Sequence, residues 1–134
     1  MSKEGENKIV YKELSYKIVG VMFDVYNELG YGHPEKVYEK AIEKAFVISG
    51  ISYQRQANFN LTYHGEIVGK YYIDFIVDNK IVLELKKDRR FPKRNIEQIK
   101  GYLQATNMKL AILANFTPEG VNFLRVLNIP EDQS

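Results

Sequence analysis

The sequence contains no cysteine, and this absence removes several classes of chemistry at once. Disulfide bonds, thiolate metal sites and cysteine nucleophiles are excluded, and a reducing compartment, by default the cytoplasm, is the expected location. No uninterrupted apolar run approaches the ~20 residues that a membrane-spanning helix needs. The polar segment 1–8 does not resemble a signal peptide. We therefore expect a soluble protein.

A strong charge of one sign is also lacking, because the net charge is only +2. The local distribution is less even: residues 86–94 read Lys-Lys-Asp-Arg-Arg-Phe-Pro-Lys-Arg, with six basic side chains and one acid. Pro92 suggests a helix start, where main-chain N–H groups also favour phosphate. An ordinary solvated loop is the alternative. We interpret the following residues as nucleic-acid contacts: Lys87, Arg89, Arg90, Lys93 and Arg94.

The length of 134 residues and the hydrophobic fraction of 45% fit one domain with a substantial core, spanning residues 10–128. Helical periodicity and turn signals predict two opening helices, a three-stranded meander, a third helix, a fourth strand and a short C-terminal helix or turn. This order, ααβββαβ, predicts an α/β sandwich with a central mixed four-stranded sheet. The expected ranges are 11–29, 34–49, 53–63, 66–77, 81–86, 92–106 and 109–115.

Three charged residues interrupt two apolar strands of the expected meander: Asp74, Glu84 and Lys86. Opposed residues of an antiparallel pair face the same side, so Asp74 opposes Glu84 only if the connection has odd length, as with a three-residue loop at 78–80. A two-residue loop would put the two acids on opposite faces. Lys86 shares the face of Glu84 because it follows two residues later.

Charges in such apolar strands are costly unless they pair or hold an ion. Two facing carboxylates suit a hard cation such as Mg²⁺ or Mn²⁺, and the Lys86 ammonium could hold a phosphate oxygen or orient an attacking water. The alternative is a cross-strand ion pair on a solvated sheet face, worth ~0.2–1 kcal/mol. The apolar character of the strands favours the metal site.

These residues carry a resemblance to a known family. Asp74, the run Glu84-Leu85-Lys86 and the later Gln98 resemble the PD-(D/E)XK nuclease superfamily. The segment Gly32-His33-Pro34-Glu35-Lys36-Val37-Tyr38 resembles the motif that names its GxxExxY branch. The likeness extends over residues 10–128 and implies a restriction-endonuclease-like fold. One departure is Ile73, which precedes Asp74 where the superfamily name has proline.

The resemblance implies a role for each matching position. Asp74, Glu84 and the Leu85 carbonyl would bind metal, Glu35 would approach the metal from its helix, Lys86 would be catalytic, and Gln98 would line the site. Acids in the first turn of a helix are also favoured by the helix dipole alone, which is the alternative for Glu35. Tyr38 lies one turn after Glu35, where it either lines the site or belongs to the core.

The hypothesis is a Mg²⁺- or Mn²⁺-dependent nuclease that hydrolyses phosphodiester bonds, in DNA more than in RNA. A catalytically inactive nucleic-acid-binding module on the same fold is one alternative, and a regulatory interaction protein with a structural metal is another. One short domain offers little surface to grip a duplex, so a homodimer or a larger partner is plausible.

Overall fold

A computed structural model describes residues 10–87 and 93–128, with only the main chain described for Lys93 and Arg94. The predicted order of helices and strands is found as far as the fourth strand. The elements are α2 (Lys12–Leu29), α3 (Glu35–Ser49), β1 (Tyr53–Tyr63), β2 (Glu66–Val77), β3 (Ile81–Lys86), α4 (Lys93–Thr106), β4 (Leu110–Thr117) and β5 (Gly120–Leu127).

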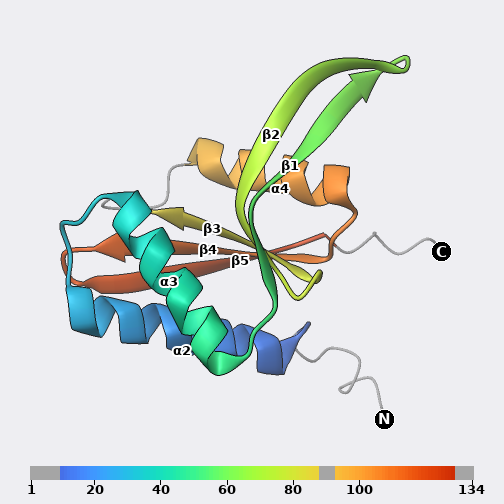
Figure 1. Ribbon diagram of the computed structural model, residues 1–134. Coiled ribbons are helices and arrows are strands. Elements are labelled where there is room, and N and C mark those ends of the chain that lie inside the picture. The colour runs from blue at the N-terminus through green and yellow to red at the C-terminus, as the bar shows by residue number, and fades with distance from the viewer. Residues whose placement is uncertain (1–9, 88–92, 129–134) are drawn as a thin grey trace, which may run out of the picture.

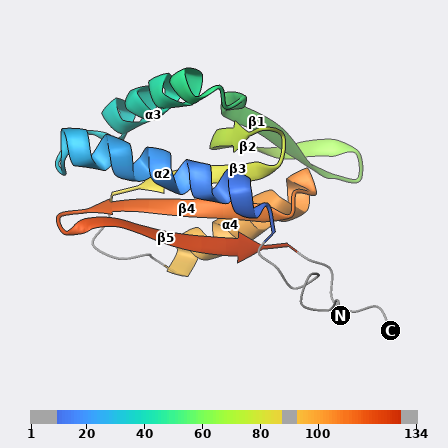
Figure 2. The same ribbon diagram turned by 90° about the horizontal axis from the view of Figure 1, so that it is seen from below.

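The strands form one five-stranded sheet in the order β1-β2-β3-β4-β5. Only β3 and β4 are parallel, and α4 makes the crossover that a parallel pair requires. Figure 2 shows the sheet between two layers, with α2 and α3 on one face and α4 on the other. Each face has its own apolar core: Phe75 and Leu83 belong to the α2/α3 side, and Ile76 and Val82 to the α4 side. The predicted α/β sandwich with a mixed sheet is confirmed.

The C-terminal prediction was wrong, because residues 120–127 form a fifth strand rather than a short helix or turn. Thr117 pairs with Gly120 across a two-residue turn. The Thr117 hydroxyl donates to the Gly120 carbonyl (2.8 Å) and accepts from the Glu119 N–H (3.2 Å). A threonine that seemed to cap a helix instead closes a hairpin, and the sheet gains an antiparallel edge.

The faces of β2 exchange at Asp74. Ile73 packs in the core on the α4 side, whereas Phe75 packs on the α2/α3 side. Residues two apart in a strand normally share a face. The β1–β2 register skips Asp74 and Gln56, which lie between the pairs Arg55–Phe75 and Ala57–Ile73, and the φ of Gln56 is left-handed at +53°. The reversal of alternation therefore coincides with the position of Asp74.

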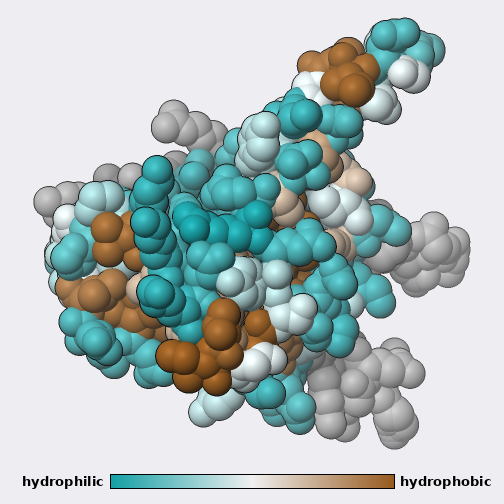
Figure 3. All heavy atoms as spheres, in the orientation of Figure 1, coloured by the Kyte–Doolittle hydropathy of each residue, from teal (hydrophilic) through white to brown (hydrophobic). Residues whose placement is uncertain are grey.

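Beyond this reversal the β1–β2 hairpin leaves the body of the molecule. Figures 1 and 3 show it as a two-stranded projection, which we call the arm and define as residues 57–72. Its base is held to α4 by three mutually contacting rings, with centroids 5.6–5.8 Å apart: Phe59, Tyr71 and Tyr102. Within the described residues, no helix has the length and apolarity needed to cross a bilayer.

Candidate active site

The two predicted carboxylates meet where β2 and β3 separate. The ladder between these strands pairs Phe75 with Leu83 and ends at the turn 78–80, so the odd-length connection is confirmed. Beyond Phe75, side chains replace the ladder. The Asp74 N–H donates to Glu84 Oε1 (2.7 Å), and the Leu85 N–H donates to Asp74 Oδ2 (2.9 Å). Each acid thus bonds the strand of the other, which fixes both carboxyl groups across the gap.

Both carboxyl groups are removed from water. Glu84 is only 5% exposed, and burial, followed by the charge of Asp74, raises its pKa to about 8. Burial likewise raises the pKa of Asp74 to about 6, although the Leu85 N–H acts in the opposite direction. Near neutral pH the pair therefore retains a proton that two isolated carboxylates would lose. Positive charge beside the pair would favour the release of that proton.

Lys86 supplies part of that charge. It is the last residue of β3, it is half-buried, and its ammonium acts to lower the pKa of both Asp74 and Glu84. Its neighbour in parallel β4 is Asn115, a fully buried polar residue that the sequence analysis did not select. The signal was present, because Asn115 interrupts the apolar run from residue 110 to residue 116.

Helix α3 brings two further acids toward the pair. Glu35 lies in its first turn, as predicted, and its charge acts to raise the pKa of both Asp74 and Glu84. Glu39 is one turn later and has a larger effect on Asp74 than Glu35 has. The sequence analysis missed Glu39, although the spacing of four residues on one helix puts it on the same side as Glu35.

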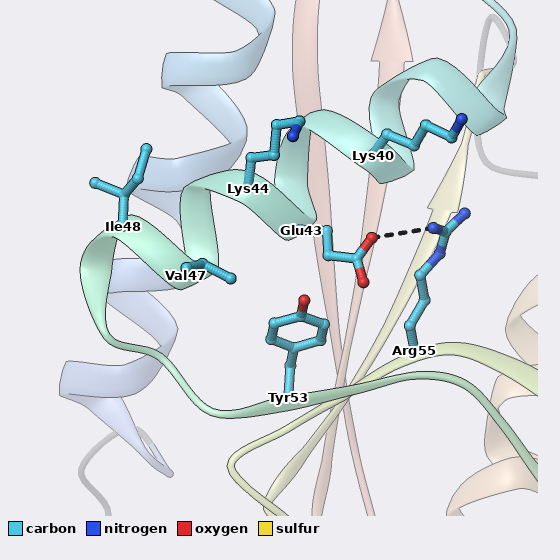
Figure 4. Close-up of a pocket in the computed structure, with 7 residues that line it drawn as sticks. All are labelled: Lys40, Glu43, Lys44, Val47, Ile48, Tyr53 and Arg55. Atoms are coloured by element: carbon cyan, nitrogen blue, oxygen red, sulfur yellow. Dashed lines mark hydrogen bonds and ion pairs between the residues drawn. The ribbon is translucent and has the colours of Figure 1, made fainter.

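Glu39 already has a basic partner. Arg55 of β1 donates to Glu39 Oε1 through Nη2 (2.8 Å) and to Glu43 Oε1 through Nη1 (3.1 Å). Figure 4 shows the second of these ion pairs at the edge of a hollow of about 770 Å³ between α3 and β1. None of the predicted site residues lines this hollow. Its lining residues are Lys40, Glu43, Lys44, Val47, Ile48, Tyr53 and Arg55.

Tyr38 belongs to the core rather than to a cleft. Its side chain is fully buried, and its ring stacks on Phe116 with centroids 4.4 Å apart. The hydroxyl donates to the Gly30 carbonyl and accepts from the His33 N–H (3.4 Å). Tyr38 therefore holds the turn that leads into α3, and in this way it helps to position Glu35 in the first turn of that helix.

Gln98 is exposed on α4, on the other side of the sheet from α3. It lines a hollow of about 460 Å³ together with Tyr102, which lies one turn later on the same helix. The pKa of Tyr102 is raised to about 12 by burial and by the charges of Glu84 and Asp74. Gln98 is thus one helical turn from Tyr102, whose pKa is affected by the charges of Asp74 and Glu84.

The basic segment is described only at its beginning. Lys87 Nζ donates to the His33 carbonyl (2.9 Å) and lies 5.9 Å from the centroid of the Tyr31 ring, so it ties the end of β3 to the turn before α3. Arg89 and Arg90 lie outside the described residues, and the side chains of Lys93 and Arg94 are likewise not described.

Comparison with known families adds the decisive observation. Residues 12–126 match the family described as the PD-(D/E)XK nuclease superfamily. The chain belongs to this superfamily. Nucleases of the PD-(D/E)XK superfamily generally use divalent metal ions. No curated protein sequence matches the chain.

Two solved structures share the fold of this superfamily member. The crystal structure of SSO0001 has a TM-score of 0.56 at 19% identity, and the match covers 74% of this chain and 52% of that one. An alkaline exonuclease, LHK-Exo from Laribacter hongkongensis, has a TM-score of 0.53 at 11% identity, with 71% and 56% covered. The chain spans about half the length of each, and the likeness is one of restriction-endonuclease-like fold.

The donor set of this PD-(D/E)XK domain fits a hard divalent cation. Asp74 and Glu84 each use one carboxylate oxygen on a main-chain N–H and have a second oxygen to offer. Their raised pKa values mark a position that added positive charge would stabilise. Among the described residues, no three histidine or acidic side chains already converge as a complete metal cluster. A metal held by this pair would need further ligands.

Proposed function

We propose that the chain is a divalent-metal-dependent nuclease of the GxxExxY branch that hydrolyses phosphodiester bonds in DNA in preference to RNA. The proposal rests on half-buried Asp74 and buried Glu84, which are hydrogen-bonded to each other's strands where β2 and β3 separate, with Lys86 beside them. The motif from Gly32 to Tyr38 supports the assignment to the branch. Membership in the superfamily supports the reaction class.

Mg²⁺ or Mn²⁺ would be held by Asp74 and Glu84, with Glu35 and the Leu85 carbonyl as further ligands. The bound cation would supply positive charge for the phosphoryl oxygens and lower the pKa of a coordinated water. Lys86 holds a phosphate oxygen or orients the attacking water through its ammonium. Gln98 supports the site from α4.

The protein grips its substrate through phosphates. Lys87 and the residues that follow it form a basic segment between the catalytic strand and the start of α4. One domain with a core of residues 10–128 offers little surface for contact with a duplex, so a second copy or a larger partner supplies the remaining contacts. The expected location is the cytoplasm.

The test is cleavage of single-stranded, duplex and branched DNA and RNA with Mg²⁺ or Mn²⁺. We expect metal-dependent cutting by the wild type and a loss of at least ~100-fold in Asp74→Asn and Lys86→Ala, because the first removes a carboxylate that would hold the metal and the second removes the ammonium at the phosphate. The matched controls are Asp78→Asn and Lys80→Ala, which alter the exposed ion pair in the adjacent turn (3.4 Å) and should retain activity.

A second candidate is a nucleic-acid-binding module that keeps the fold without turnover. It is favoured by the absence, among the described side chains, of a ready-made cluster of three metal ligands. No cutting of any substrate, with nucleic-acid affinity equal in the wild type, Asp74→Asn and Lys86→Ala, would establish the module and refute the nuclease.

A further inference from the structure

The arm presents one exposed face built from amides. The even-numbered residues of β1 beyond the reversal, Asn58 and Asn60, are exposed, whereas Phe59 between them turns toward α4. Across the hairpin Asn58 is paired with Tyr72, and Asn60 with Lys70. Because directly opposed residues share a face, two amides, one phenol ring and one ammonium form a single polar surface.

This surface begins at the active site. Only Ile73 separates Tyr72 from Asp74 on strand β2. At ~3.3 Å per residue, the eight steps from Asp74 to Glu66 at the tip extend ~26 Å, which matches about eight base pairs of a duplex at ~3.4 Å each. A substrate whose phosphodiester lies at Asp74 can therefore run along the arm.

The side chains match the edges of bases. An asparagine amide offers a donor and an acceptor together, as the adenine edge does in the major groove, and a lysine beside it can reach a phosphate. The major groove of B-form DNA admits a two-stranded β-ribbon, whereas that of an RNA duplex is too narrow for side chains to read. Acidic residues are scarce, with Glu66 at the tip as the one acid of the arm.

We infer that the arm is a duplex-reading element that lies in the major groove of B-form DNA, with Asn58 and Asn60 contacting base edges and Lys70 a phosphate. This inference rests on the proposed nuclease function and narrows its substrate to double-stranded DNA. The apolar tip, where Ile67 and Val68 are 63% and 65% exposed, suggests a protein partner as the rival. Figure 3 shows an apolar patch near the far end of the arm.

The experiment measures binding separately from cutting. In a Glu84→Gln background, which we expect not to cut, fluorescence anisotropy compares duplex DNA, single-stranded DNA and duplex RNA. The double variant Asn58→Ala/Asn60→Ala should bind duplex DNA about tenfold or more weakly, with single-strand affinity changed less than about twofold. Lys70→Ala should reduce the slope of log K against log salt by about 0.9.

The matched control is Asn122→Ala, which removes an exposed amide from β5, far from the arm in the sheet order. It should bind like the background protein. If the alanine pair unfolds the arm in thermal melts, Asn58→Thr/Asn60→Thr keeps good strand formers at both positions and the same loss is expected.

The inference would be overturned if the background protein did not bind duplex DNA, or if the double variant bound it with unchanged affinity. If, in addition, light scattering showed that the background protein is a dimer and the double variant a monomer, the arm would be a self-association surface. A wild type that cuts nothing while the arm variants lose duplex binding would refute the nuclease and leave the arm assignment standing.

Discussion

Two acidic clusters, each with one buried and one partly exposed carboxylate, differ in how their charge is balanced. Glu39 and Glu43 share the guanidinium of Arg55, which lies 2.8 and 3.1 Å from them. Asp74 and Glu84 form no ion pair with a basic side chain of the described residues, and their hydrogen bonds come from main-chain N–H groups. The charge of the first cluster is balanced by a described basic side chain, whereas the charge of the second is not.

This difference separates structural from chemical use of the same residue type. A cluster whose charges are balanced contributes to the stability of the protein, and this contribution is lost when one partner is removed. An unbalanced cluster costs stability, and such a cost is typical of sites that bind a charged ligand. The pKa of Glu84, raised by burial to about 8, expresses that cost. Opposite responses to substitution should therefore distinguish the two clusters.

The largest expected effect is on stability at the balanced cluster. Arg55→Met keeps the bulk of the side chain but leaves Glu39 buried without its partner, so we expect a loss of about 2–3 kcal/mol in the free energy of unfolding. This is below the value for a fully buried pair because Arg55 is 23% exposed. Denaturant titration at pH 7 would measure it.

Arg125→Met is the matched control, because the Arg125 guanidinium bonds the Val10 carbonyl (2.7 Å) and forms no ion pair with a carboxylate of the described residues. It should cost less than Arg55→Met. Equal losses in the two variants would mean that the Arg55 network contributes through packing alone, and the contrast between the clusters would lose its electrostatic basis.

The next effect is a dependence of stability on pH in metal-free protein. The pKa of Glu84 is about 8 in the folded protein and 4.5 normally, so between these values the folded state binds the proton more tightly. The contribution of protonated Glu84 to stability is fully present below pH 4.5 and is lost as the pH rises through about 8. The melting temperature should therefore decrease from pH 5 to pH 8 in EDTA.

Glu84→Gln removes this titrating group and should raise the free energy of unfolding at pH 8 by about 1–2 kcal/mol. For a chain of this size, the melting temperature should rise by ~4 °C for each kcal/mol. Glu119→Gln, at an exposed turn position, should leave the pH profile of the wild type unchanged. A steeper fall in Glu84→Gln than in the wild type would contradict the burial argument.

Much of this arrangement could be predicted from local sequence, and the exceptions share a cause. Strand alternation made the placement of Asp74 near Glu84 conditional on an odd-length connection, and the structure supplies the three-residue turn 78–80. Sequence also placed Glu35 in the first turn of its helix, where it lies. The fifth strand was missed because Thr117-Pro118-Glu119-Gly120 suits a helix cap as well as a hairpin turn, and only pairing with β4 decides between them.

The reversal of faces at Gln56 had no sequence signal, since a left-handed glutamine is uncommon and carries no characteristic neighbours. The pairing of Arg55 with Glu39 joins residues 16 positions apart through the packing of β1 against α3. Such contacts depend on the tertiary arrangement and not on a local pattern. Charge balance, which distinguishes the two clusters, therefore became visible only in the folded structure.

The smallest effect tests whether a cation completes the second cluster. At a concentration ten times its dissociation constant, Mg²⁺ or Mn²⁺ should stabilise the folded wild type by about 1.4 kcal/mol, because it binds the folded state and not the unfolded chain. Thermal melts at pH 8 should show an increase of ~5 °C that is absent from Asp74→Asn and Glu84→Gln and is retained in Glu39→Gln. If all variants gained equally, the cation would be acting elsewhere on the surface. If Glu39→Gln instead lost this increase in melting temperature as completely as Asp74→Asn does, the two clusters would form one site. Removing the Glu39 charge would then weaken the electrostatic field that holds the cation beside Asp74.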